Sequence, residues 1–190
     1  MLAVNVMTRL KEATVAQHRA VEHALDLMRE EVTLTDYSRY LTRMFGVHAP
    51  FEAGLARMPQ LRALVPDLEQ RSKTPLLLRD LQALGLRATV HAPLPPLLGT
   101  ARALGALYVL EGSTLGGKII LRHLEKVLGA RIASAHAYLA AYGAEVGPMW
   151  KRFSRMLDSS LHIDEAELVA GATEMFACIG DWLAREDIQG

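Results

Sequence analysis

The chain has 190 residues, about half of them apolar, and its 21 basic and 21 acidic side chains balance. This length supports one domain with a substantial core. Balanced charge argues against nucleic acid or an anionic membrane surface as the main partner, because both require a basic excess. Cys178 is the only cysteine, and the stretch Met1–Met7 lacks a signal-peptide pattern. We therefore expect a cytoplasmic, monomeric protein with a single domain over residues 1–190.

Composition and residue spacing predict an all-α protein. Ala, Leu, Met, Arg and Glu dominate, and the alternating β-branched runs typical of strands are nearly absent. Caps, prolines and glycines divide the chain into seven or eight helices. In chain order, the main expected helices run from Thr8 to about Met28, from Thr33 or Thr35 to about Arg57, from Thr74-Pro75 to Gly85, from about Leu98 to Leu128, near Ala135–Tyr142, over Pro148–Ser159, and from Asp164 to about Arg185.

Three glycines inside the long expected helix are the most informative feature of the sequence. Gly112, Gly116 and Gly117 lie in the segment Tyr108–Ile120. Each glycine in a helix interior costs about 0.5–1 kcal/mol relative to alanine. The surrounding apolar stretch, Leu97–Leu121, is interrupted by charged residues, so we expect a buried helix rather than a membrane span. The glycines indicate that this helix must lie very close to something flat or bulky.

Three interpretations of the glycines are open. The run Gly112–Lys118 matches most of a phosphate-loop pattern, but Ile119 stands where a hydroxyl should hold Mg²⁺, and no strand is expected before it. Close packing of a neighbouring backbone against Gly112 and Gly116 is the second interpretation. The third is a helix that lies over a planar ligand, which requires a ligand anchor elsewhere in the chain.

The first expected helix supplies a candidate anchor, His18. Lys11, Thr14, His18 and Glu22 follow one another at spacings of three, four and four residues, so they share one helix face. A neutral imidazole can bind a metal through one nitrogen while the other donates to an acceptor such as Glu22. Lys11 could pair with an anionic group of the same ligand. A surface histidine in a salt-bridged helix would give the same pattern.

These two segments together resemble the heme oxygenase family, particularly its bacterial branch. The run Leu10–Glu22 is similar to the helix that carries the proximal histidine, and Tyr108–Gly117 is similar to the distal helix. Two weaker matches support them. Trp150–Arg155 resembles the helix that supplies basic residues to the heme propionates, and Phe176 resembles an aromatic residue of the pocket.

The resemblance implies a multi-helix bundle of the heme oxygenase type and a role for each matched residue. His18 would bind the heme iron, with Glu22 near its second nitrogen, Thr14 on the proximal face and Phe176 in the pocket lining. The residues expected to pair with the propionates are all basic: Lys11, Lys151 and Arg155.

On the distal side, the resemblance implies that glycine backbone lies against the heme. The residues expected there are Gly112, Gly116 and Gly117. Ser113 would help to hold ordered water that protonates the bound oxygen species. Animal-type members of the family carry an aspartate at this position, whereas members of the bacterial branch do not. Glu111 is two residues earlier and should point elsewhere on the helix, so the proton-delivery network has no assigned residues beyond Ser113.

The implied reaction is the degradation of heme, with O₂ and external electrons, to biliverdin, CO and Fe²⁺. The sequence has no flavin or nicotinamide fingerprint and no cysteine cluster, so the electrons would come from a ferredoxin, a flavodoxin or a reductase. Two alternatives remain open from sequence alone. A non-catalytic heme carrier or sensor on the same scaffold would also need His18. A helical enzyme of the thiaminase or pyrroloquinoline-quinone-synthase type would share the bundle without heme.

Overall fold

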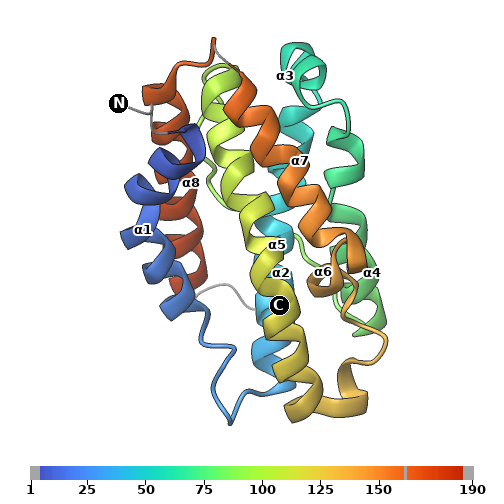
Figure 1. Ribbon diagram of the computed structural model, residues 1–190. Coiled ribbons are helices and arrows are strands. Elements are labelled where there is room, and N and C mark those ends of the chain that lie inside the picture. Colours follow the sequence, from blue (N-terminus) through green and yellow to red (C-terminus); the bar gives the residue numbers. More distant parts are fainter. Residues whose placement is uncertain (1–4, 161, 186–190) are drawn as a thin grey trace.

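The computed structural model describes residues 5–160 and 162–185, and these residues contain helices and no strand. The all-α prediction is therefore confirmed (Figure 1). The helices are α1 (Val6–Leu25), α2 (Leu34–Leu55), α3 (Pro59–Leu64), α4 (Thr74–Ala83), α5 (Thr100–Leu128), α6 (Ala137–Ala140), α7 (Val146–Ser159) and α8 (Glu165–Ala184), with short 3-10 turns η1 (Leu68–Arg71), η2 (Gly129–Ile132) and η3 (Gly143–Glu145).

The ends of α1 differ from the prediction because its caps differ. The helix begins before Thr8, since the side chain of Asn5 accepts a hydrogen bond from the Thr8 backbone N–H at 2.9 Å and is the N-cap. It ends before Met28, because Asp26 adopts a left-handed backbone conformation with φ of 43°. The predicted anchor face of α1 lies well inside these limits.

The helix α5 is the central helix of the bundle, and α8 crosses it very closely. A Cβ atom on Gly105 would stand 2.0 Å from the carbonyl oxygen of Leu168, and one on Gly171 would stand 2.2 Å from that of Arg102. Both positions therefore require glycine, since any side chain would force the two backbones apart. The helix α8 also packs along α1, whereas α1 and α5 make few direct contacts (Figure 1).

By length and composition alone, α5 could cross a membrane, and it is the one such helix in the described part of the chain. It lies instead in the interior of the bundle, where α3, α6, α7 and α8 pack around it. Its apolar side chains Leu104, Leu107 and Leu110 are almost fully buried. The apolar character of α5 is thus explained by the protein core, as the interrupting charges predicted.

Candidate functional site

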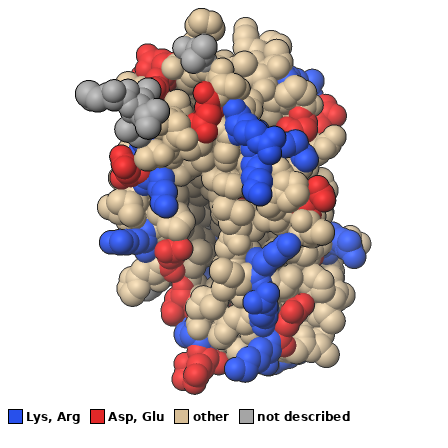
Figure 2. Space-filling model, in the orientation of Figure 1, with Lys and Arg blue, Asp and Glu red and all other residues tan. Residues whose placement is uncertain are grey.

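A groove runs between α1 and the C-terminal half of α5. Figure 2 shows it as a hollow in the surface beside α1. The helix α8 lies behind and packs on both helices. At one end Thr14 of α1 lies near Tyr108 of α5: burial raises the pKa of the Tyr108 phenol, and Thr14 opposes that effect. At the other end His123 Nε2 lies 3.0 Å from the carbonyl oxygen of Arg29, in the connection from α1 to α2. The groove is therefore bounded at both ends.

His18 presents its imidazole from α1, with its side chain 57% exposed. Its Nδ1 lies 3.5 Å from Oε2 of Glu22. The ring of Phe176, on α8, packs edge-on against the imidazole with a centroid distance of 5.8 Å. A carboxylate beside Nδ1 favours the tautomer with its proton on that nitrogen, which leaves the Nε2 lone pair for a metal. Three of the predicted site residues thus lie together.

The three glycines of α5 have different surroundings. A Cβ atom on Gly116 would meet no atom within 4 Å, and one on Gly112 would meet only the Trp150 ring, at 3.6 Å. A Cβ atom on Gly117 would stand 2.8 Å from the carbonyl oxygen of Leu139, in α6. Gly116 therefore offers bare backbone to open space, as a planar ligand requires. Gly117 is explained by the close approach of α6.

These surroundings decide between the interpretations left open by the sequence. The phosphate-loop interpretation is wrong, because the glycines lie within one continuous helix and no strand occurs in the described ranges. The packing interpretation is correct for Gly117, but no neighbouring backbone lies against Gly112 or Gly116. The closest packing of α5 occurs at Gly105, which the sequence pattern did not single out.

Three predicted basic residues are exposed near the groove: Lys11 on α1, and Lys151 and Arg155 on α7. None of them forms an ion pair with another side chain of residues 5–160 or 162–185. The two helices contact each other, and the backbone N–H of Met7 donates to Oδ1 of Asp158 at 3.2 Å. These cations are consequently available to an anionic ligand.

Thr14, by contrast, is buried, and its hydroxyl donates to the carbonyl oxygen of Leu10 at 2.7 Å.

Ser113 and Glu111 point to different sides of α5. The hydroxyl of Ser113 is on the exposed side and donates to the carbonyl oxygen of Leu110 at 2.7 Å. Glu111 is 2% exposed and faces away from the groove, as the helical spacing predicted.

A buried cluster of charges surrounds Glu111, and sequence reasoning missed it. The carboxylate accepts hydrogen bonds from Arg71 Nη1, from Lys73 Nζ at 3.3 Å and from the Tyr142 hydroxyl at 2.7 Å. Arg71 also donates two hydrogen bonds to Asp67, at 2.8 and 2.7 Å. Burial lowers the pKa of Lys73, and the charge of Glu111 opposes that effect. No local pattern could reveal the cluster, because the fold alone brings η1 to α5.

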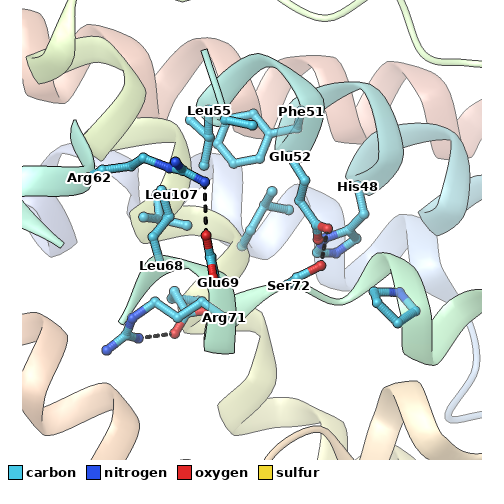
Figure 3. Close-up of a pocket in the computed structure, with 14 residues that line it drawn as sticks. His48, Phe51, Glu52, Leu55, Arg62, Leu68, Glu69, Arg71, Ser72 and Leu107 are labelled. Carbon is cyan, nitrogen blue, oxygen red and sulfur yellow. Dashed lines mark hydrogen bonds and ion pairs between the residues drawn. The ribbon is translucent and has the colours of Figure 1, made fainter. Parts of the chain in front are cut away.

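A cavity of about 370 Å³ adjoins this cluster between α2, η1 and α5 (Figure 3). His48 and Glu52 enter its wall from α2. Nδ1 of His48 lies 3.3 Å from Oε1 of Glu52, and its Nε2 lies 3.2 Å from the hydroxyl of Tyr138. Glu52 also accepts hydrogen bonds from the Ser72 hydroxyl and, at 2.7 Å, from the Lys73 backbone N–H.

Glu52 makes the folded state sensitive to acid. Burial alone would raise the pKa of Glu52, but the hydrogen bond and charge of His48, with hydrogen bonds from Ser72 and Thr74, lower it from 4.5 to about 2. A carboxylate whose pKa is lower in the folded than in the unfolded state stabilises the fold above its unfolded pKa. This stabilisation is lost as the pH falls towards the folded pKa.

We expect the free energy of unfolding contributed by Glu52 to fall by about 2 kcal/mol between about pH 5 and about pH 3. Urea denaturation at the two pH values measures this loss in the wild type and in Glu52→Gln, which carries no titrating carboxyl. The variant should be less stable at the higher pH and should lose about 2 kcal/mol less on acidification. Equal acid sensitivity of the two proteins would contradict the assignment.

No protein-family model matches the chain. It is 35% identical over 153 residues to a heme oxygenase of Xanthomonas campestris pv. campestris, covering 79% of this chain and 90% of that protein. It is 29% identical over 192 residues to the heme oxygenase PigA of Pseudomonas aeruginosa, covering 93% of this chain and 90% of that protein.

Two solved structures share the architecture. The NO- and CO-bound heme oxygenase of Neisseria meningitidis superposes with a TM-score of 0.79 at 25% identity, covering 99% of this chain and 100% of that chain. The heme oxygenase of Leptospira interrogans superposes with a TM-score of 0.78 at 17% identity, covering 95% and 99%, and shows the likeness of fold.

Proposed function

Because this chain belongs to the heme oxygenase family, we propose that it degrades heme to biliverdin, CO and Fe²⁺ with O₂ and electrons from outside, and that the groove between α1 and α5 holds the heme. The observation that carries the site assignment is the placement of the His18 imidazole and the bare backbone of Gly116 on the two helices that flank one groove.

On the proximal side, His18 would hold the iron through Nε2, because Glu22 lies beside Nδ1. Heme, when bound, supplies both the iron at which O₂ reacts and the macrocycle that is oxidised. His18 would be the only protein ligand of the iron, which would leave the iron able to react with O₂. Phe176 restricts rotation of the imidazole from its position on α8.

On the distal side, the absence of a side chain at Gly116 lets the backbone of α5 lie against a flat ligand. Gly112 keeps the space between α5 and Trp150 free of a side chain. Ser113 presents a hydroxyl on the exposed side of the same helix, where it can give a proton or hold ordered water. Gly117 contributes indirectly, since it lets α6 approach α5.

The propionates of heme are carboxylates, and three basic side chains suit them. Lys11, Lys151 and Arg155 flank the groove from α1 and α7 without ion-pair partners in the described part of the chain. Charge-assisted hydrogen bonds to carboxylates are roughly twice as strong as neutral ones. We therefore assign these residues to the propionates.

Electrons must come from a second protein, which we infer to be a ferredoxin, a flavodoxin or a reductase. The cations Lys118, Arg122 and Lys126 form an exposed row on α5 at intervals of one helical turn. Figure 2 shows basic side chains gathered beside the groove. Such a surface favours an acidic partner, because complementary charge accelerates association. We place the protein in the cytoplasm as a monomer, in line with its lone cysteine.

Titration with hemin tests the proposed function. The purified protein is expected to give a saturable Soret band and, after ascorbate or a reductase is added in air, to convert the bound heme to a biliverdin spectrum. The same mixture without oxygen is the control and should not convert. Hemin that binds without conversion would favour a carrier, which the two relatives, both described as heme oxygenases, do not support.

A further inference from the structure

Two aromatic side chains lead from one end of the groove to the surface of α7. Tyr108, on α5, lies at the end of the groove where Thr14 approaches it from α1. The centroid of its ring lies 5.7 Å from that of Trp150, on α7. Phenol and indole rings lose one electron more readily than phenyl or aliphatic side chains do. The pair is therefore suited to carry electrons between the groove and the surface.

The absence of a side chain at Gly112 lets the indole of Trp150 approach α5. A Cβ atom on Gly112 would stand 3.6 Å from Cη2 of Trp150 and 3.7 Å from its Cζ3. Both atoms belong to the six-membered ring, so this ring faces α5 about one helical turn after Tyr108. Gly116 follows Gly112 after about one more turn. The indole therefore lies beside the part of α5 against which we place the heme.

The opposite edge of the Trp150 indole meets solvent. Its Nε1 has no hydrogen-bond partner among residues 5–160 and 162–185, and it is not one of the buried polar atoms that lack a partner there. Water therefore reaches this atom and can accept its proton. The other tryptophan of the chain, Trp182, is 2% exposed, and its Nε1 donates to the carbonyl oxygen of Arg43 at 2.9 Å.

On its inner side Trp150 contacts a ring that resists oxidation. The centroid of the Phe153 ring lies 6.1 Å from that of Trp150, and Phe153 is 1% exposed. The guanidinium group of Arg71 lies 5.3 Å from the Phe153 centroid, and its charge disfavours a second cation there. An electron vacancy at Trp150 therefore stays at the exposed indole and does not spread through Phe153 into the core.

The charge near Trp150 favours an anionic reductant. Basic side chains gather beside the groove (Figure 2). Exposed cations occur on both helices that hold the aromatic pair: Lys151, Arg152 and Arg155 on α7, and Lys118 and Arg122 on α5. Two propionates would neutralise only part of this charge. Local positive charge concentrates small anions at a surface, and salt screens the effect.

We propose that Trp150, connected to the groove by Tyr108, gives the heme-loaded protein a peroxidase activity towards small anionic reductants, an inference that rests on the proposed function. Hydrogen peroxide is the oxidant: it accepts two electrons and two protons, its O–O bond breaks, and both oxygen atoms leave as water. Trp150 supplies each electron through Tyr108 to the bound heme and releases its Nε1 proton to solvent. One electron from a reductant and one proton from solvent then restore the indole.

Oxidation of ferrocyanide by hydrogen peroxide and the hemin-loaded protein tests this activity. Ferrocyanide is a small anion that gives one electron, and the absorption of ferricyanide measures the rate. Trp150→Phe keeps an aromatic ring in place and is expected to lower the rate per bound heme at least about tenfold. Trp182→Phe is the matched control, because Trp182 is buried on α8, outside the pair, and it should react at the wild-type rate. Circular dichroism confirms that both variants are folded.

A second pair of variants tests the link to the groove. Tyr108→Phe should slow ferrocyanide oxidation in the same direction as Trp150→Phe, because a phenyl ring does not pass the electron on. Tyr37→Phe is its control and should react at the wild-type rate, since Tyr37 is buried and donates to the carbonyl oxygen of Ala135 at 2.7 Å, away from the pair. Higher ionic strength should slow the wild type, because salt screens its attraction for ferrocyanide.

Electron paramagnetic resonance separates electron transfer from a structural effect. Hemin-loaded protein that is frozen soon after peroxide is added, without reductant, should show the signal of an indole radical. The signal should narrow when the tryptophan rings are deuterated. It should be absent from Trp150→Phe and present in Trp182→Phe, and peroxide without hemin should not produce it.

Ferrocyanide oxidation by Trp150→Phe within about twofold of wild type, or an indole signal that persists in this variant, would overturn the inference. A rate that does not fall with ionic strength would overturn the preference for anions. A wild type that converts heme to biliverdin but oxidises no ferrocyanide would overturn the peroxidase activity and leave the proposed function standing. A wild type that binds no hemin would overturn both.

Discussion

Replacing His18 with alanine is expected to abolish heme degradation and leave the helical bundle folded. The side chain is 57% exposed, and an exposed pair such as His18–Glu22 contributes about 1 kcal/mol or less to stability. The imidazole is, in our assignment, the only protein ligand of the iron. Removing the imidazole should therefore reduce heme degradation by more than about 10–100-fold, which is the effect typical of removing a residue that hydrogen-bonds to a metal ligand.

Absorption spectroscopy with hemin and reductant measures the effect of His18→Ala, and circular dichroism confirms that the variant is folded. His23→Ala is a suitable control, because His23 is an exposed histidine on the same helix. Added imidazole should restore part of the hemin spectrum of His18→Ala. A His18→Ala protein with the wild-type Soret band and wild-type conversion would refute the assignment of the ligand.

Replacing Glu111 with alanine is expected to lower the free energy of unfolding by about 3–5 kcal/mol. Glu111 is 2% exposed and is the shared acceptor for Arg71, Lys73 and Tyr142. Its removal leaves the ammonium group of Lys73 and the guanidinium group of Arg71 buried with less opposite charge beside them. Such buried charges lower the free energy of unfolding by more than an ordinary truncation of a core side chain does.

Urea denaturation measures the loss for Glu111→Ala, with Glu125→Ala as the control. Glu125 is an exposed carboxylate on the same helix, so its removal should change stability by less than about 0.5 kcal/mol. A double variant, Glu111→Leu with Lys73→Met, should be more stable than Glu111→Leu alone, because it removes a stranded charge. A loss below about 1 kcal/mol for Glu111→Ala would show that the cluster stabilises little.

The helices could be predicted because their signals are local. The Thr33 side chain accepts a hydrogen bond from the backbone N–H of Asp36, and the Asp36 carboxylate accepts one from the backbone N–H of Thr33. This reciprocal cap starts α2, and a segment of four residues is enough to predict it. Asp164 caps α8 without the reciprocal bond: its carboxylate accepts from the backbone N–H groups of Ala166 and Glu167. The start of α1 differs from the predicted one because Asn5 and Thr8 are both good caps, and sequence alone does not rank them.

The site could be predicted in part for the same reason. His18 and Glu22 are one helical turn apart, so their contact follows from the sequence once α1 is recognised. A glycine, however, does not reveal what lies opposite it. Gly105, Gly116 and Gly117 look alike in sequence, yet one faces α8, one open space and one α6. The partners of Glu111 were equally hidden, because they are 31 to 40 residues away in the sequence and reach it only through the fold.

The circumference of α5 is divided among incompatible tasks. One side has α8 against Gly105 and open space at Gly116, a second admits no side chain where α6 packs on Gly117, and a third holds the carboxylate of Glu111. Tolerance to mutation along this helix should therefore depend on the direction in which a side chain points as well as on its position along the helix. Inserting a single residue near its middle would turn every later side by about 100°. Point substitutions elsewhere could not repair such a lesion, because it would misalign all three sides at once.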